Sequence, residues 1–474
     1  MPVLFTKRTY ESVLILLLIA LVITFFNRAE YYDEAWFAEQ SFWLIRDGRV
    51  RSELFRDYNG WEKSIYVFHK LFIYAGALIM SVTGVTVAAS KVVSILFGLL
   101  GGYLLWLYGK RYSLEHQWLS LFLYLGCGTL IRYISVNRPE TMCMALGLAS
   151  YLALDPPKQS RSNPVMAGML AGLAALTHLN GLIYLIAGTS WLFIKIDWKS
   201  AFVFVIAGSL TLSIYGLDAL LDGNVALLLQ QFFNDPATQE NLHFSDKLAV
   251  LADYHQIFFH SQNEAALSVL FILCAITFRK RISLSQPVLL YTLLILSSFW
   301  LLTKSDTDIY FLLFVPWLAI ITAHWLVTYL PDQPVLQRRA SRILLYLYAL
   351  VSLIQLREVI VENQTVPNTE DRNALLASYM PATNTKVIAP LAFFFGQMDN
   401  YKIRGLTYYY LLERENKEIP LSTFFKTAKE DNVKYIISDY GQNASYNIPS
   451  DAPVQIGNYK RIFQDRWNSI YARQ

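Results

Sequence analysis

Long apolar runs separated by short polar segments dominate the first 355 residues of the chain. A helix of about 20 apolar residues is long enough to cross the hydrocarbon core of a bilayer. The polar segments between the runs hold basic clusters, as at 109–111 and 279–281. Basic loops favour the cytoplasmic side, so placing every cluster there sets the direction of each run. We predict about eleven spans: 11–26, 86–108, 118–134, 141–154, 164–177, 182–194, 201–221, 265–278, 288–302, 309–327 and 343–355.

The segment between the first two spans, residues 27–85, is predicted to be an outer loop with juxtamembrane helices. Residues 34–45 carry apolar and aromatic side chains at helical spacing and end at Asp47-Gly48, a typical helix stop. Residues 62–82 also have helical spacing, but Lys63 and two further basic side chains within the run favour a surface helix over a span. We therefore expect a transmembrane domain over 1–360 that includes this loop.

The tail, residues 361–474, is much more polar than the rest of the chain. Short β-prone segments at 386–389 and 434–438 flank a helical pattern at 421–431. This alternation predicts a small soluble α/β domain. With the amino terminus inside and eleven crossings, the tail lies outside the cytoplasm.

Composition agrees with a multi-pass membrane protein. Of 474 residues, 54% are hydrophobic and 16% are charged, whereas soluble domains carry roughly 25% charged residues. The net charge of +4 is too small to indicate a nucleic-acid partner. The three cysteines lie in apolar runs without metal-ligand spacing, and a histidine-containing loop at 243–260 matches no recognised ligand motif. We expect no metal and no cofactor.

The predicted topology gathers most of the ionisable residues near span ends on the outer face. Such residues are costly in a membrane unless they are paired or functional. A carboxylate beside cations suits transfer of a group from a lipid phosphate, because the carboxylate can take a proton and the cations can hold the departing phosphate. The residues are Asp33, Glu34, Lys63, His69, Arg138, Glu140, His178, Asn180, Lys304, Asp306 and Asp308.

Structural roles remain open for each of these residues. Asp33 can be a helix N-cap, and Lys63 can extend to the membrane surface. Arg138 and Glu140 can simply pair with each other, and His178 can be a hydrogen-bonded structural histidine. A catalytic reading requires Asp33 to share a cavity with at least one of Lys63, Arg138 and Lys304.

Several short motifs, taken in order, resemble those of bacterial GT-C membrane glycosyltransferases. The family is the dolichyl-phosphate-mannose protein mannosyltransferase-like family, which includes the lipid A aminoarabinose transferases. The similar segments span about 11–329. They are Asp33-Glu34, Tyr58-Asn59-Gly60 with Glu62-Lys63, Ala88-Ala89-Ser90-Lys91 with Ser94, Asn137-Arg138-Pro139-Glu140, Thr177-His178-Leu179-Asn180-Gly181, and Lys304 with Tyr310 and Pro316.

This resemblance implies a GT-C-like helical bundle and a polyprenyl-phosphate-linked sugar donor used at the outer face of the cytoplasmic (inner) membrane. It implies Asp33 as the general base, with inversion, and Glu34 as its supporting neighbour. Lys63 would lie near the lipid phosphate. The remaining implied cavity residues are His69, Arg138, Glu140, His178, Lys304 and Tyr310. Ser64-Ile65 stands where the family often has two prolines, which leaves the substrate contacts open.

The resulting hypothesis is a glycosyltransferase that moves a sugar to a hydroxyl of a glycan, lipid or protein acceptor, with membrane lipids as its surroundings. A transporter or flippase of lipid-linked sugars is the first alternative. It predicts broken helices and repeated halves, and the sequence has no clear repeat. A non-catalytic scaffold with a partner-binding outer domain is the second alternative.

Overall fold

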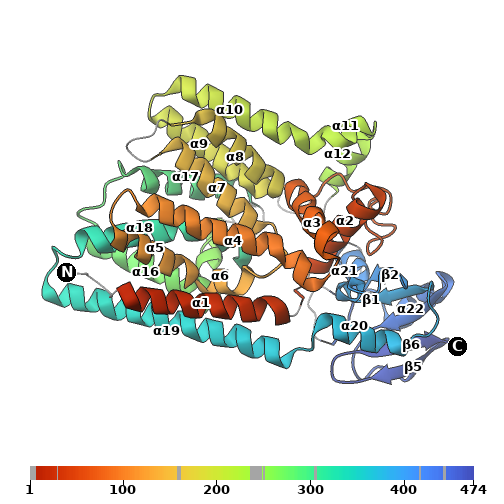
Figure 1. The fold of residues 1–474 in the computed structure, drawn as a ribbon. Coiled ribbons are helices and arrows are strands. Elements are labelled where there is room, and N and C mark those ends of the chain that lie inside the picture. Colours follow the sequence, from red (N-terminus) through yellow and green to blue (C-terminus); the bar gives the residue numbers. More distant parts are fainter. Residues whose placement is uncertain are drawn as a thin grey trace. The chain divides into compact units, whose positions relative to one another are not determined.

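The computed structural model describes residues 7–28, 30–31, 33–156, 162–234, 248, 251–303, 307–415, 418–440 and 445–474. Helices dominate the described chain, and six short strands lie in its carboxyl-terminal part (Figure 1). The chain forms two compact units. The first unit comprises Met1–Phe26, His69–Phe72 and Val93–Gln364, and the second comprises Asn27–Phe68, Ile73–Val92 and Thr365–Gln474.

The first unit is a helical bundle. Within it α1 (Lys7–Asn27) packs beside α19 (Val335–Thr365), where Leu14 and Leu17 share an apolar cluster with Leu356. The helix α4 (Val87–Gly109) belongs to this unit from Val93 onward, and its start belongs to the second unit. The other helical elements are α5 (Leu114–Leu125), α6 (Gly128–Tyr133), α7 (Glu140–Leu154), α8 (Pro164–Thr177), η1 (Leu179–Gly181), α9 (Leu182–Ile194), α10 (Trp198–Leu212), η2 (Ser213–Gly216), α11 (Leu217–Leu221), α12 (Val225–Phe233), α15 (Gln256–Phe259), α16 (Gln262–Phe278), α17 (Pro287–Leu302), η3 (Asp308–Leu313) and α18 (Val315–Tyr329).

Among the described residues, three helical segments are long and apolar enough to cross a membrane. They are Val87–Gly109, Trp198–Leu221 and Val335–Ser378. A fourth candidate is the pair Leu251–Phe259 and Gln262–Phe278, which bends by 102°. Most remaining predicted spans form apolar helices of 10–17 residues. At 1.5 Å per residue these helices fall short of a ~30 Å core, so the total of about eleven spans stays a prediction.

One predicted span, 118–134, is broken in the structure. The α5 helix ends at Leu125 and α6 begins at Gly128, because Cys127 has an extended backbone (φ −67°, ψ 125°). Side chains from α19 satisfy carbonyl groups beside the break. The Tyr348 hydroxyl donates to the Leu123 carbonyl at 2.6 Å, and the Ser352 hydroxyl donates to the Gly126 carbonyl at 2.6 Å. Hydrogen bonds from α19, which is distant in the sequence, therefore stabilise the break between α5 and α6.

A second correction concerns the helix expected over 62–82. The α3 helix covers only Lys70–Thr83, and turns precede it. Asp57, Asn59 and Gly60 have positive φ angles of 71°, 48° and 71°, a conformation that ends regular helix or strand. The Tyr58-Asn59-Gly60 segment is therefore a tight turn.

The second unit contains α2 (Glu34–Asp47), the loop that follows it, and the tail. The predicted helix stop is confirmed, because Gly48 has φ +69° and its N–H donates to the Leu44 carbonyl at 3.1 Å. Beneath the loop, the fully buried Glu39 carboxylate accepts hydrogen bonds from Trp43 Nε1 (3.0 Å), the N–H groups of Glu53 (2.6 Å) and Leu54 (3.0 Å), and the Ser52 hydroxyl. One carboxylate thus fixes the start of the loop.

The tail forms the expected small α/β fold, which is confirmed for both predicted strands and the helix. Its sheet has the order β2-β1-β3-β6-β5-β4, with β2, β1 and β3 parallel and the other neighbours antiparallel. The elements are α20 (Thr369–Ser378), β1 (Lys386–Ala389), η4 (Leu391–Phe394), β2 (Lys402–Gly405), α21 (Leu406–Glu415), α22 (Leu421–Glu430), β3 (Val433–Ile437), β4 (Gln455–Ile456), β5 (Tyr459–Gln464) and β6 (Ser469–Arg473).

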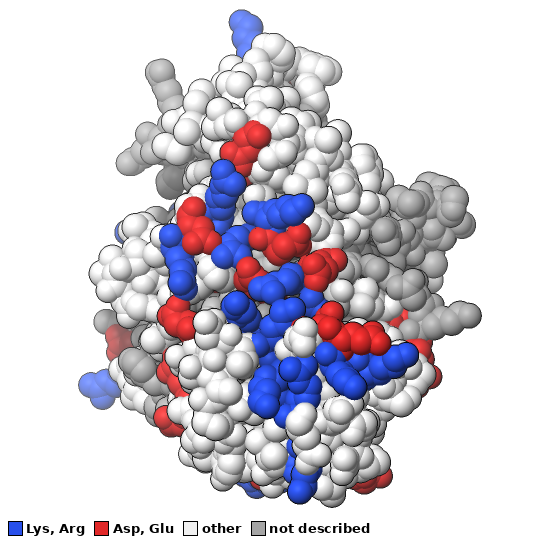
Figure 2. All heavy atoms as spheres, turned by 90° about the vertical axis from the view of Figure 1, so that its right-hand side faces the viewer, with Lys and Arg blue, Asp and Glu red and all other residues white. Residues whose placement is uncertain are grey.

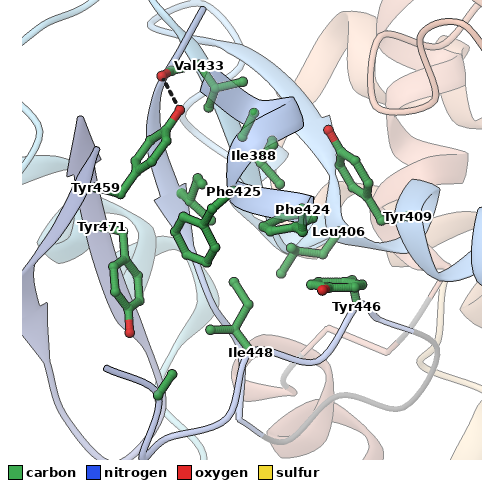
Figure 3. Close-up of a cluster of buried hydrophobic side chains, with 13 residues drawn as sticks. Ile388, Leu406, Tyr409, Phe424, Phe425, Val433, Tyr446, Ile448, Tyr459 and Tyr471 are labelled. Carbon is green, nitrogen blue, oxygen red and sulfur yellow. Dashed lines mark hydrogen bonds between the residues drawn. The ribbon is translucent and has the colours of Figure 1, made fainter. Parts of the chain in front are cut away.

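An aromatic core lies between this sheet and α22. Phe424 and Phe425 of α22 point into it, and Phe425 faces the strand residues Tyr459 and Tyr471 (Figure 3). The Tyr459 hydroxyl donates to the Val433 carbonyl at 2.8 Å, so its polar end is satisfied inside the core.

Residues 27–68 pack in the same unit as this sheet. The Gly405 N–H of β2 donates to the Leu54 carbonyl at 2.8 Å. Phe42 of α2 meets Phe394 edge to face, and Arg46 pairs with Asp399 at 2.6 Å. Residues 42–54 therefore contact the tail within this unit.

Candidate functional site

Asp33 occupies the N-cap position of α2, as expected, but its side chain does not cap the helix. Two neighbouring glutamates instead accept backbone hydrogen bonds at the start of α2. Glu30 accepts a hydrogen bond from the Ala35 N–H at 3.1 Å, and Glu34 accepts one from the Tyr31 N–H at 2.6 Å. The partly exposed Asp33 carboxylate is therefore not committed to a structural cap.

Glu34 is fully buried and pairs with an equally buried lysine. Lys91 Nζ lies 3.8 Å from Glu34 Oε2 and donates a hydrogen bond to the Arg28 carbonyl at 2.8 Å. Sequence reasoning included Lys91 in a motif but gave it no site role. Its position in the first turns of an apolar helix was the available signal, because a lysine there requires a partner.

Lys63 lies in the turn after Gly60, and its side chain is exposed. Its N–H donates to the Gly60 carbonyl at 3.0 Å, and within the described chain its ammonium group has no ion pair or hydrogen bond. The predicted proximity of Lys63 to Asp33 stays a prediction. Lys304 and Asp306 lie outside the described residues.

In the first unit, five predicted site residues lie together. The His69 and His178 rings stack with centroids 4.7 Å apart and planes at 20°. Tyr310 meets His178 edge to face at 5.7 Å. Arg138 Nη2 lies 3.0 Å from Glu140 Oε1, and both charged groups act on the titration of His69. Four elements therefore meet here: the first turn of α7, the carboxyl end of α8, the residue before α3, and η3.

Both imidazoles of this group are neutral near pH 7. Burial first, and then the positive charge of Arg138, lower the pKa of His178 to about 3. Burial and the neighbouring His178 hold the pKa of His69 well below its usual value. The Asn180 N–H donates to His178 Nδ1 at 3.0 Å, so the single proton of the neutral His178 ring is on Nε2. His178 can therefore donate a hydrogen bond without carrying charge.

Arg138 is held by its backbone as well as by Glu140. The Arg138 carbonyl accepts a hydrogen bond from the Ser94 hydroxyl at 2.9 Å. The Arg138 N–H donates to the Ser94 hydroxyl oxygen at 3.2 Å. Glu140 begins α7 and is 1% exposed, whereas the Arg138 side chain keeps 17% of its surface exposed. The Arg138–Glu140 pair is thus observed, and the arginine still reaches solvent.

A second polar group that sequence reasoning missed surrounds Glu264. Glu264 completes a capping box with Ser261 and also accepts a hydrogen bond from the Thr129 hydroxyl at 3.0 Å. Asp308, the first residue of η3, accepts a hydrogen bond from the Tyr133 hydroxyl at 3.0 Å. The Ser261-to-Glu264 spacing was the sequence signal for this cap.

Among the described residues, no group of three His, Cys, Asp or Glu side chains is arranged to hold a metal ion. The predicted site residues that the structure describes offer carboxylate, imidazole, phenol and guanidinium groups. Asp33 and Glu34 belong to the second unit, and His69, Arg138, Glu140, His178 and Tyr310 belong to the first.

Comparison of the sequence alone finds no matching protein-family profile and no matching curated protein. Comparison of the structure finds solved membrane glycosyltransferases. ArnT from Cupriavidus metallidurans in the apo state matches with a TM-score of 0.65 and 13% identity, over 98% of both chains. The same protein bound to undecaprenyl phosphate matches with a TM-score of 0.65 and 12% identity, over 97% of both chains.

An archaeal enzyme gives a weaker match. The oligosaccharyltransferase AglB from Archaeoglobus fulgidus, in complex with an inhibitory peptide and a dolichol-phosphate, has a TM-score of 0.54 and 14% identity. The match covers 91% of this chain and 69% of AglB. ArnT and AglB are both GT-C glycosyltransferases, so the chain has the GT-C fold, and the resemblance to that type and to the aminoarabinose transferases is confirmed.

Proposed function

We propose that this protein is a membrane glycosyltransferase that transfers a sugar from a polyprenyl-phosphate donor to a hydroxyl of a glycan, lipid or protein acceptor. The observation that carries the proposal is the ArnT-like fold over 98% of both chains. Two matched structures hold undecaprenyl phosphate or dolichol-phosphate, which supports a donor of that class. The acceptor class remains broad because the fold alone does not select one.

In this proposal the first unit binds the charged part of the donor. Arg138 offers a guanidinium group that suits phosphate oxygens. His178 offers an uncharged N–H donor, and Tyr310 packs beside it. Glu140 orients Arg138 through their 3.0 Å contact. Lys63 and Lys304 would add positive charge around the phosphate, and His69 would hold the His178 ring by stacking.

Asp33 acts as the general base that accepts the proton from the attacking hydroxyl. A single displacement at the anomeric carbon breaks the bond to the phosphate oxygen, forms the bond to the acceptor oxygen and inverts the centre. Glu34 holds the start of α2 through its contacts with Lys91 and the Tyr31 N–H. The absence of a side-chain cap on Asp33 supports this division of roles.

The protein would work in the cytoplasmic membrane with its tail outside. The basic clusters between spans support this orientation through the positive-inside rule. The break between α5 and α6 is a feature that the flippase alternative predicts, but the matched solved structures are glycosyltransferases, which supports transfer of the sugar.

A transfer assay tests the proposal. Purified protein is incubated with a panel of polyprenyl-phosphate sugars and candidate acceptors, and wild type is compared with Asp33→Asn. We expect transfer with at least one donor, and a loss of about 10²–10⁴-fold in rate for the variant. Asp47→Asn, at the other end of α2, should keep the wild-type rate. Full activity of Asp33→Asn would remove Asp33 from the base role, and movement of intact donor between leaflets without transfer would favour a flippase.

A further inference from the structure

A group of cations outside the proposed transfer site lies on two segments of the first unit. One segment, residues 279–286, follows α16, and the other, residues 330–342, includes the first turns of α19. We call these two segments the basic loop pair. They hold one carboxylate, that of Asp332, and six cations, which are Arg279, Lys280, Arg281, Arg338, Arg339 and Arg342.

Direct contacts join the two segments to each other and to the end of α18. Arg281 Nη1 lies 2.6 Å from Asp332 Oδ2. Gln286 Nε2 donates a hydrogen bond to the Tyr329 hydroxyl at 2.7 Å, and the Tyr329 ring lies against Phe278 with centroids 6.0 Å apart. Cations from distant parts of the sequence therefore lie on neighbouring segments of one surface.

Three of these cations have no competing protein partner. Arg279, Lys280 and Arg339 are exposed, and within the described chain their side chains form no ion pair or hydrogen bond. Arg281 keeps 42% of its side chain exposed although it pairs with Asp332. The basic loop pair therefore presents positive charge that protein carboxylates do not neutralise.

Exposed apolar side chains lie in the same two segments and directly after them. Leu284 is 65% exposed, Leu336 is 79% exposed and Ile343 is 58% exposed. The α19 helix has 31 residues, which at 1.5 Å per residue gives about 46 Å, longer than the ~30 Å hydrocarbon core. Because the predicted span 343–355 begins directly after Arg342, the first turns of α19 should lie in the headgroup layer of the bilayer.

The cations that Figure 2 shows are in a different setting. On that face, aspartate and glutamate side chains lie beside the lysine and arginine side chains. In the second unit, Arg46 pairs with Asp399 at 2.6 Å and Arg404 pairs with Asp431 at 2.8 Å. Such pairs leave less net charge for an anionic partner, so the basic loop pair is the stronger candidate.

We propose that the basic loop pair binds the headgroups of anionic phospholipids. The cations contact the lipid phosphates, and Leu284 and Leu336 enter the apolar layer beside the acyl chains. A phospholipid offers both parts in one molecule, whereas a nucleic acid or an acidic soluble protein offers no acyl layer for the leucines. The proposal is independent of the transfer reaction, because it involves none of the proposed site residues.

Lipid binding to the full-length protein in detergent tests this inference. Native mass spectrometry counts the lipids bound during titration with phosphatidylglycerol or with phosphatidylcholine of identical acyl chains. We expect phosphatidylglycerol to bind more tightly by about fivefold or more, and the difference to shrink as salt is raised. Inorganic phosphate in large excess should displace no phosphatidylglycerol, because it makes no apolar contact. Equal affinities for the two lipids, or displacement by phosphate, would overturn the proposal.

Removal of the unpaired cations should weaken the binding. The triple variant Arg279→Gln, Lys280→Gln and Arg339→Gln should lose about 10²-fold in affinity for phosphatidylglycerol, because each cation near a membrane surface contributes roughly a factor of five. Arg339→Gln alone should lose about fivefold. Since all three side chains are exposed, the melting temperature without added lipid should be preserved.

A second triple variant controls for general positive charge. Lys110→Gln, Lys195→Gln and Lys199→Gln remove the same charge from exposed lysines elsewhere in the first unit. Carboxylates accompany these lysines, because Asp197 lies between two of them in the sequence and Asp155 acts on the titration of Lys195. We expect the affinity for phosphatidylglycerol to stay close to that of wild type. Equal losses in the two triple variants would assign the lipid preference to dispersed charge and would overturn the proposal.

Discussion

At the scale of single residues, the buried charges of the second unit govern the region around Asp33. Glu34 and Lys91 have no exposed surface, and each is the other's ionic partner. A buried pair costs desolvation energy when it forms, but removing one partner costs more, because the remaining charge is stranded. The pair therefore constrains the start of α2 more than it adds net stability.

Replacing Lys91 by Met should destabilise the protein by about 3–5 kcal/mol, because Glu34 loses its partner. The double variant with Glu34→Gln should recover much of that loss. Thermal unfolding of the detergent-solubilised protein measures both. A double variant that is as unstable as the sum of the two single variants would show that the contact carries no coupling energy.

Glu39 should make the loop after α2 sensitive to pH. Burial raises the pKa of Glu39 to about 7, although hydrogen bonds from Ser52, Trp43, Leu54 and Glu53 oppose the shift. The unfolded carboxyl titrates near 4.5. The folded state thus binds more protons between these values, so the stabilisation is present below about pH 4.5 and is lost as pH rises through about 7.

Hydrogen–deuterium exchange over 50–61 measures this effect once intrinsic rates are corrected for pH. We expect severalfold faster exchange at pH 8 than at pH 5.5. The variant Glu39→Gln should lose this pH dependence, whereas Glu430→Gln, an exposed change on α22, should retain it. The same pH dependence in both variants would assign it to another group.

At the scale of elements, hydrophobic run length predicted most helices of the first unit. The run at 164–177 coincides with α8, and the run at 86–108 differs from α4 by one residue at each end. This works because apolar length and flanking polar residues are local properties. The break between α5 and α6 could not be predicted, because the groups that satisfy its carbonyls come from α19, more than 200 residues away.

Removing the Ser352 hydroxyl should therefore lower the free energy of unfolding more than removing an exposed hydroxyl does. Ser352→Ala leaves the buried Gly126 carbonyl without this donor, with an expected cost of about 1–3 kcal/mol. Ser213→Ala, which removes an exposed hydroxyl that donates to the Leu210 carbonyl of the preceding helix α10, should stay within about 0.5 kcal/mol of wild type. Thermal unfolding compares the two, and equal small losses would show that the break needs no support from α19.

At the scale of the whole molecule, sequence patterns identified residue types better than they identified partners. His69, Arg138, Glu140, His178 and Tyr310 were expected in one cavity, and the structure brings them together in one unit. Polar residues among apolar ones are visible in a sequence. Ring stacking, the pairing of Lys91 with Glu34 and the pairing of Arg281 with Asp332 depend on contacts between distant segments.

The contact between Gly405 and Leu54 also has a consequence for the tail as a fragment. Strand β2 is an outermost strand of its sheet, and the Leu54 segment covers its open side. A fragment of residues 365–474 would expose that backbone, and uncovered strands pair with other copies. We expect this fragment to self-associate in size-exclusion chromatography with light scattering, and a version with 49–61 attached through a flexible linker to be mainly monomeric. In the whole protein, the segment around Leu54 would thus prevent β2 from pairing with strands of other copies.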